Sequence, residues 1–325
     1  MPDISARSAR IDALDIARGA ALLAMASYHF TWDLEFFGYV EAGTTSHGAW
    51  KFYARCIASS FLIMVGVGLF LAHGRGIRWP AFWKRFAMIA GAAAAISAAT
   101  WFATPDAFIF FGILHEIALG SLLGLAFLRL PALPVLAAAA AVVAAPWFLR
   151  AAAFDNPLLW WLGLAPADPR SNDYVPLFPW FGAILAGIAL ARLARRYGLA
   201  EWLAGLKAGA WARPFRWAGR HSLVFYLVHQ PVLIACVWLF AQVWPAPPAD
   251  RAGAFIDACE AQCANQREAG FCRPYCGCML GKLETEELLG RLSSGAARNA
   301  LHDKLDALAL ECEAQIDDGP ETPSP

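Results

Sequence analysis

Seven stretches of about 20 mainly apolar residues follow one another along the chain, and such a stretch is typical of a helix that crosses a membrane. The sequence of 325 residues is 59% hydrophobic and only 16% charged, whereas soluble domains average about 25% charged residues. We therefore predict an all-α fold, a polytopic transmembrane helix bundle over residues 1–244. The expected spans lie at residues 12–32, 54–73, 84–103, 107–128, 132–150, 175–194 and 222–244.

Several classes of protein and site do not fit the sequence. The formal net charge is zero, so no overall positive field attracts nucleic acid. The sequence contains no Gly-rich phosphate loop, no His-Glu-x-x-His motif, and no small-residue cleavage site after the first apolar run. Residues 151–164 are apolar but contain Pro157, so we interpret them as an interfacial or re-entrant segment.

Basic residues between the predicted spans indicate the orientation, because cytoplasmic loops carry an excess of Lys and Arg. The loops on one side of the membrane carry few basic residues, namely Lys51, Arg55, Arg150 and Arg170. We therefore expect a protein of the cell (inner) membrane with its N-terminus in the cytoplasm and its C-terminal tail outside. The loops expected in the cytoplasm carry Arg7, Arg10, Arg75, Arg78, Lys84, Arg85, Arg192, Arg195, Arg196, Lys207, Arg213, Arg216 and Arg220.

The tail has a composition of its own. Prolines indicate a stiff linker at 245–255, residues 256–314 are predicted to form a small cysteine-rich helical domain, and residues 315–325 are expected to be disordered. Six cysteines suit three disulfides, which form outside the cytoplasm, in agreement with the charge rule. They are Cys259, Cys263, Cys272, Cys276, Cys278 and Cys312.

The cysteine spacing suggests a pattern of cross-links. Two Cys-x3-Cys pairs each place two thiols on one helical face, which suits a helical hairpin joined by two disulfides. Cys276 and Cys278 are too close to share that face, so one of them should bond elsewhere, for example to Cys312. A metal site built from the same thiols is the alternative, but the expected oxidising compartment favours disulfides, and we expect no metal.

Ionisable side chains inside the first predicted span are candidates for function, because charges within a membrane are costly. Arg18 and His29 are 11 residues apart, which places them on one helix face about 16 Å from each other. Arg18 either pairs with Asp15 or holds a phosphate-bearing donor. His29 either accepts a proton from an attacking group, with Asp33 one turn away to orient it, or makes an interhelical hydrogen bond.

Further candidates lie in the later spans. His115 is expected to complete the proton path, and Glu116, Asp173, Trp180, His229 and Gln230 are expected to contact the acceptor. Arg220 and His221 precede the last span, where a basic helix start favours phosphate. Each candidate also has a structural interpretation, either an interhelical hydrogen bond or an interfacial anchor.

Five groups of residues form a recognisable pattern over about residues 8–235. They are Arg10-x3-Leu14-Asp15-x2-Arg18-Gly19, His29-Phe-x2-Asp33-Leu-x2-Phe37-Gly38, Gly112-Ile-Leu-His115, Pro179-Trp180-x-Gly182 and Gly219-Arg-His-Ser222-Leu-x2-Tyr226-Leu-x-His229-Gln230-Pro231. Together they resemble bacterial members of the heparan-α-glucosaminide N-acetyltransferase catalytic-domain family, within the transmembrane acyltransferase superfamily. The Arg-x10-His spacing recurs in the acyltransferase-3 branch of that superfamily. The cysteine-rich tail falls outside the resemblance.

The resemblance implies transfer of an acetyl or related acyl group from cytosolic acetyl-CoA to a glycan or glycolipid acceptor on the far side of the bilayer. Arg18 then matches the donor-binding arginine of the family, and His29 matches its catalytic histidine. His47, followed by Trp50, is the alternative counterpart of that histidine. Direct attack by the acceptor and a covalent acyl-histidine route both stay open.

Two other classes of function remain as alternatives. A transporter also places polar residues at mid-membrane, but we find no inverted repeat in the sequence. A scaffold or sensor would act through the disulfide-rich tail and would not require the charged residues in the spans. A homodimer is compatible with each of these functions.

Overall fold

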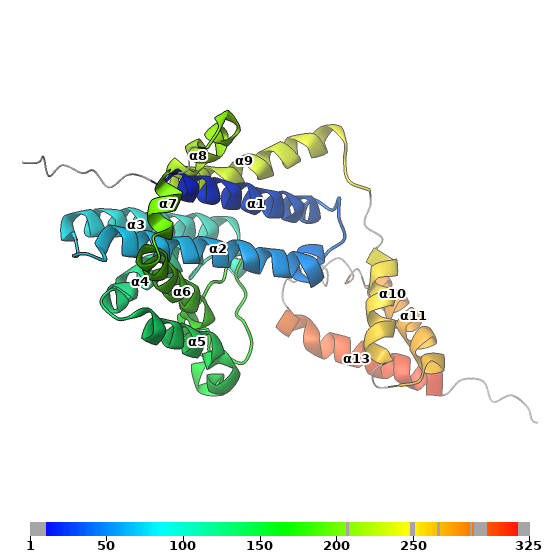
Figure 1. Ribbon diagram of the computed structural model, residues 1–325. Coiled ribbons are helices and arrows are strands. Elements are labelled where there is room, and N and C mark those ends of the chain that lie inside the picture. The colour runs from blue at the N-terminus through cyan, green and yellow to red at the C-terminus, as the bar shows by residue number, and fades with distance from the viewer. Residues whose placement is uncertain are drawn as a thin grey trace, which may run out of the picture. The chain divides into compact units, whose positions relative to one another are not determined.

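The computed structural model describes residues 11–205, 208–247, 251–264, 267–286, 288 and 298–317. The described residues are helical, with loops and short 3-10 turns between the helices and no strand among them. The chain divides into two compact units, Met1–Pro245 and Ala246–Pro325 (Figure 1). The predicted all-α class is confirmed, as is a separate helical tail with cysteine pairs at disulfide distance.

Each of the seven apolar stretches is helical over most of its length in the first unit, and two short helices, α7 and α8, lie between the sixth and the seventh. The helices are α1 (Asp12–Phe36), α2 (Gly48–His73), α3 (Trp79–Ala103), α4 (Ile113–Gly124), α5 (Ala132–Leu149), α6 (Leu177–Arg196), α7 (Leu199–Gly205), α8 (Arg213–Arg220) and α9 (Ser222–Val243).

Five of these helices are long and apolar enough to cross a membrane, namely α2, α3, α5, α6 and α9. Helix α1 has sufficient length but carries several charged residues. Helix α4 has 12 residues and is therefore about 18 Å long, less than the hydrocarbon thickness of about 30 Å. The chain is a membrane protein, and the count of seven spans and the orientation stay predictions.

The apolar segment 151–164 forms no α-helix. It contains only two 3-10 turns, Ala152–Phe154 and Trp160–Leu162. The Tyr174 hydroxyl donates to the Trp160 carbonyl at 2.6 Å, which fixes this segment to the chain before α6. Burial, with the nearby Asp168 carboxylate, raises the pKa of Tyr174 to about 12, so the hydroxyl keeps the proton that it donates.

The core of the first unit lies where α2 packs against α6. Leu62, Ile184 and Ile188 are each fully buried there. Glycines let the two backbones approach, because a Cβ at Gly66 would overlap the Ile184 carbonyl and one at Gly187 would overlap the Ile63 carbonyl. This small-residue contact is the usual way in which membrane helices come close together.

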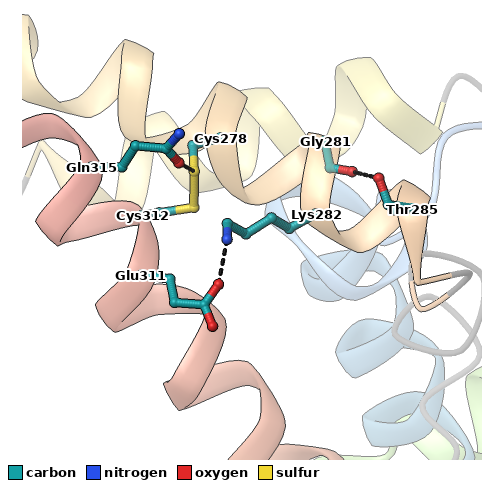
Figure 2. Close-up of a disulfide and its surroundings, with 7 residues drawn as sticks. All are labelled: Cys278, Gly281, Lys282, Thr285, Glu311, Cys312 and Gln315. Atoms are coloured by element: carbon teal, nitrogen blue, oxygen red, sulfur yellow. Dashed lines mark hydrogen bonds and ion pairs between the residues drawn. A yellow bond between two sulfur atoms is a disulfide. The ribbon is translucent and has the colours of Figure 1, made fainter.

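In its described part, the second unit contains α10 (Arg251–Cys263), α11 (Ala269–Thr285) and α13 (Arg298–Asp317). Two disulfides, Cys259–Cys276 and Cys263–Cys272, join α10 to α11, and Cys278–Cys312 joins α11 to α13. Figure 2 shows the third bridge beside the Lys282–Glu311 ion pair. The predicted hairpin with two cross-links and the separate bridge to Cys312 are both present, so these six thiols are paired with one another.

The ends of the tail differ from the expected boundaries. Helix α10 begins at Arg251, inside the segment 245–255 that we predicted as a linker. Helix α13 continues to Asp317, three residues into the expected disordered tail. Both helices carry cysteines that bridge to α11, namely Cys259 and Cys263 on α10 and Cys312 on α13. Residues 248–250 and 318–325 lie outside the described part, as do Arg7, Arg10 and Lys207 of the expected cytoplasmic set.

Candidate functional site

Two histidines face each other where α1 crosses α9. The ring centroids of His29 and His229 are 5.0 Å apart. His229 Nδ1 lies 2.7 Å from the Tyr226 carbonyl oxygen, and a carbonyl only accepts, so the hydrogen-bond pattern assigns the proton to Nδ1. The Nε2 of His229 therefore carries a lone pair. It is buried and has no hydrogen-bond partner among the described residues.

Asp33, one turn beyond His29, is engaged by α9 as well. It is fully buried, and Gln230 Nε2 donates to its Oδ1 at 2.7 Å. Its other oxygen, Oδ2, has no partner in the described part of the chain. The expected contact between Asp33 and His29 is therefore replaced by a contact between Asp33 and Gln230. The physical reason is that the amide reaches the carboxylate across the helix crossing.

Unpaired buried polar atoms gather at this crossing. Within the described residues, Asp33 Oδ2, Gln230 Oε1 and His229 Nε2 are all buried without a hydrogen-bond partner. Buried polar groups are almost always paired, so such a cluster needs an explanation. Each of these atoms is an acceptor, and a ligand that brings hydroxyl or amine donors would satisfy them.

Asp173 lies on the loop before α6. It contacts two of the predicted motifs, the one that contains Gly112 and His115 and the one that contains Tyr226 and His229. Its Oδ2 accepts from the Ile113 amide at 2.9 Å, at the start of α4, and lies 3.5 Å from the Tyr226 hydroxyl on α9. Burial raises the pKa of this carboxyl, and the two hydrogen bonds oppose that shift. Asp173 thus links the starts of α4 and α6 to the helix that carries His229.

His115 is part of a local network at the start of α4. Its Nδ1 accepts from the Gly112 amide at 3.1 Å, so its Nε2 is the nitrogen that donates to Ser97 Oγ at 3.1 Å. Ser97 in turn donates to the Ile109 carbonyl at 2.6 Å. Both nitrogens are occupied, which favours the structural interpretation of His115 over a role in proton transfer.

Glu116 points to a different side of α4 from His115. It is fully buried, and both of its carboxyl oxygens are without a partner within the described residues. A Cβ at Gly120 would lie 3.1 Å from one of these oxygens, which places the carboxyl over a glycine on its own helix. Trp180, which we expected near the acceptor, packs against the apolar core instead. The structure thus does not bring Glu116 and Trp180 into one site with His29.

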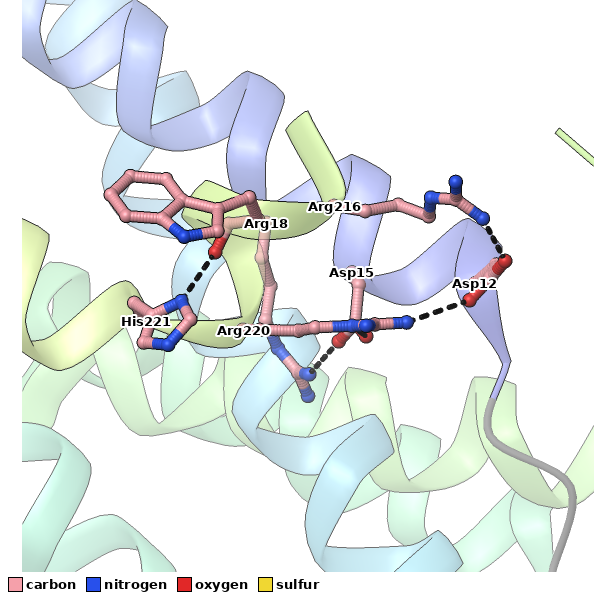
Figure 3. A network of polar contacts seen from close by, with 7 residues as sticks. Asp12, Asp15, Arg18, Arg216, Arg220 and His221 are labelled. Atoms are coloured by element: carbon pink, nitrogen blue, oxygen red, sulfur yellow. Dashed lines mark hydrogen bonds and ion pairs between the residues drawn. The ribbon is translucent and has the colours of Figure 1, made fainter. Parts of the chain in front are cut away.

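A network of ion pairs joins the start of α1 to α8 (Figure 3). Arg18 Nη1 lies 3.4 Å from Asp15 Oδ1, and Arg220 Nε lies 3.3 Å from Asp15 Oδ2. Arg216 Nη1 and Arg220 Nη2 lie 2.6 Å and 3.4 Å from the two oxygens of Asp12. His221 Nδ1 bonds to the Trp217 carbonyl at 2.9 Å. The expected donor-binding residues Arg18, Arg220 and His221 therefore lie together, and both arginines have a carboxylate partner.

Arg85 also belongs to this region, although its place in the sequence did not identify it as a site residue. A Cβ placed at Gly68 of α2 would lie 3.3 Å from Arg18 Nη2 and 3.8 Å from Arg85 Nη1. Two guanidinium groups from α1 and α3 thus converge over a glycine. A usable signal was present, because Lys84-Arg85 stands at the entry of an otherwise apolar helix.

Glu35 is a second residue that the sequence analysis missed. Its carboxylate accepts from the Gly43 amide at 2.6 Å, the Thr45 amide at 2.9 Å and the Thr45 hydroxyl at 2.7 Å. These bonds fix the loop between α1 and α2, where His47 is exposed and bonds to the Gly43 carbonyl at 2.9 Å. The alternative histidine is therefore part of a loop turn.

Comparison with known proteins adds independent evidence. Residues 10–231 match the model of one family, described as heparan-alpha-glucosaminide N-acetyltransferase, catalytic. The chain belongs to this family. No curated protein and no solved structure matches the chain.

Membership makes the chain a membrane acetyltransferase and confirms the family resemblance. The matched region begins two residues before α1 and ends at Pro231 in α9. It contains the α1–α9 crossing and the arginine network, and it excludes the disulfide-linked tail. The homodimer that the sequence analysis allowed finds no support in the structure or in the family match.

Proposed function

We propose that this protein transfers an acetyl group from cytosolic acetyl-CoA to a hydroxyl or amine of a glycan or glycolipid on the far side of the membrane. The observation that carries the proposal is the cluster of unpaired buried acceptor atoms where α1 crosses α9, beside His29. An acceptor sugar brings the hydroxyl donors that this cluster lacks.

The arginines at the start of α1 are the proposed binding site for the charged end of the donor. Arg18 and Arg85 converge over Gly68, and Arg220 lies beside Arg18 on Asp15. Guanidinium groups suit phosphate oxygens because of their fixed fork of donors. About 16 Å of helix separates Arg18 from His29, a distance that an extended pantetheine arm spans.

His29 is the proposed catalytic base. It takes the proton from the acceptor hydroxyl or amine as that atom bonds to the acetyl carbon. The carbon–sulfur bond then breaks, and the leaving thiolate takes the proton back from the imidazolium. The lone pair of His229 Nε2 is available to hold a donor hydrogen of the acceptor or of His29. The alternative is a covalent route in two steps: His29 first attacks the thioester and displaces the CoA thiolate, and the acceptor then attacks the acetyl-histidine, gives up its proton and breaks the carbon–nitrogen bond.

The test uses inside-out vesicles that contain the full-length protein, supplied with radiolabelled acetyl-CoA. We expect label in lumenal material with wild type, and a loss of about 100-fold or more in rate with His29→Ala. Binding of CoA, measured by thermal shift, should survive that substitution because the arginine end is untouched.

His47→Ala is the matched control, since it removes the exposed alternative histidine from the outer loop. It should keep most of the activity. Activity that is lost with His47→Ala but retained with His29→Ala would assign the chemistry to the outer loop. No transfer by folded wild type over a range of acceptors would contradict the proposal and favour a transporter or a scaffold.

A further inference from the structure

Four arginines surround a hollow away from the arginine network on Asp12 and Asp15. The hollow has a volume of about 390 Å³, within the range of small-molecule sites. It lies between the start of α5, at Pro131 and Ala132, and the end of α6. The four arginines that line it are Arg129, Arg192, Arg195 and Arg196.

The positive charge of this hollow is not balanced by carboxylates. Among the described residues that line it there is no Asp or Glu. In the described part of the chain, none of the four arginines forms an ion pair. By contrast, Arg18, Arg216 and Arg220 are each paired with Asp12 or Asp15. Four cations without a counter-charge in one concave site favour an anionic ligand.

Two of the arginines are held in place by the bundle. The guanidinium carbons of Arg192 and Arg195 lie 5.0 Å and 4.8 Å from the ring centroid of the buried Phe70. Arg192 also donates to the Leu128 carbonyl through Nη2, and its Nε is buried without a partner among the described residues. Donors fixed in this way are oriented before a ligand binds.

Exposed leucines on the two helices that line the hollow, α5 and α6, indicate a lipid. Leu133 on α5 is 78% exposed and Leu190 on α6 is 49% exposed. In a membrane, side chains of this kind face acyl chains. A phospholipid would lay its tails along these leucines and place its phosphate among the arginines, as basic pockets between membrane helices do with anionic headgroups.

We propose that this hollow, which we call the four-arginine hollow, binds the headgroup of an anionic phospholipid such as phosphatidylglycerol. The proposal does not rest on the acetyltransferase function. The same chemistry, a phosphate ester, is present in the diphosphate of CoA, so the test must separate the two sources.

The test measures lipid binding to the full-length protein in nanodiscs of phosphatidylcholine with or without phosphatidylglycerol. Native mass spectrometry of the released protein counts the retained anionic lipid, and a titration gives its affinity. We expect wild type to retain phosphatidylglycerol over phosphatidylcholine. Arg129→Gln with Arg196→Gln should weaken the affinity about tenfold or more, because two charges are removed near the phosphate.

Both substituted side chains are exposed, so the double variant should fold. The matched control is Arg75→Gln with Arg213→Gln, which removes the same charge from two exposed arginines outside the hollow. It should bind phosphatidylglycerol as wild type does. Equal weakening in the two double variants would show a general charge effect and overturn the proposal.

A second arm uses free CoA and nanodiscs of phosphatidylcholine alone. We expect Arg129→Gln with Arg196→Gln to leave CoA affinity unchanged. Weakened CoA binding with unchanged phosphatidylglycerol binding would overturn the proposal and assign the hollow to the nucleotide. Wild type that shows no preference for phosphatidylglycerol would overturn it without reference to any variant.

Discussion

At the scale of single residues, the candidate site depends on a few side chains that meet from distant parts of the sequence. Gln230 and Asp33 are separated by 197 positions and bond at 2.7 Å. The bond leaves one oxygen of each side chain unpaired within the described residues. Buried polar atoms without hydrogen bonds lower the stability of the empty site, and a ligand that supplies the missing donors removes that cost in free energy.

A double-mutant cycle on this pair separates a structural from a functional role. Gln230→Leu leaves the Asp33 carboxylate buried with no partner, and we expect it to lower stability by about 1–2 kcal/mol. Asp33→Leu combined with Gln230→Leu removes both polar groups and should recover most of that loss. Stability is measured as the melting temperature in detergent.

The cycle has a second readout in acetyl transfer. We expect the double variant to recover stability and to stay inactive, because the acceptor atoms are gone. A double variant that regains both stability and activity would reduce this pair to a packing role and contradict our assignment.

At the scale of helices, glycine contacts determine how closely the backbones pack. Gly66 and Gly187 allow α2 and α6 to come close together. Gly182 does the same for α6 and α5, because a Cβ at this position would lie 3.0 Å from the Ala139 carbonyl oxygen of α5. The core of the first unit follows these crossings, with Val135, Leu185 and Ala189 buried along them. A larger residue at such a crossing must separate two backbones.

Gly66→Ala tests this packing. The added methyl would overlap the Ile184 carbonyl, so we expect a loss of roughly 1–3 kcal/mol in stability, read as a lower melting temperature. Gly91→Ala in α3 is the matched control, because no described atom beyond its chain neighbours and the nearby backbone of its own helix lies within 4 Å of its Cβ position. It should be neutral or slightly stabilising. Equal effects at the two positions would show that the glycine contact does not limit the approach of α2 and α6.

Apolar length was enough to predict the helices of the seven apolar stretches but not the short helices α7 and α8, and cysteine spacing was enough to predict the hairpin of α10 and α11. Both are properties of short stretches of sequence. The partner of Asp33 could not be predicted, because the i+4 position favoured His29 while the real partner lies on another helix. Arg85 could not be predicted as a site residue for the same reason, because it lies near Arg18 only where both side chains pass over Gly68 of a third helix, α2.

At the scale of the whole molecule, the chain combines a membrane unit with a tail unit that has its own cross-links. The sequence holds eight cysteines, of which six form disulfides and two, Cys56 and Cys236, are free. The Cys278–Cys312 bridge closes the longest loop, with a sequence separation of 34. Cross-links of this kind restrict the unfolded chain and stabilise small helical units.

Counting thiols tests this organisation and the predicted orientation together. Protein denatured without reductant should react with maleimide at two cysteines, and reduced protein should react at eight. Disulfides of this kind persist outside the cytoplasm, so the result also supports an external tail. Eight reactive thiols before reduction would contradict both the bridges and the orientation.

The contact between α1 and α8 has a structural consequence. A Cβ at Gly19 would overlap the Phe215 carbonyl, and a Cβ at Gly219 would overlap the Asp15 carbonyl, so the two backbones touch directly. Only His221 separates α8 from α9. The two histidines, Arg18, Arg216 and Arg220 therefore lie on three helices, α1, α8 and α9, that contact one another. Because Arg18 and His29 both belong to α1, one continuous helix from Asp12 to Phe36 joins the arginine network to the histidine pair, with no loop between them.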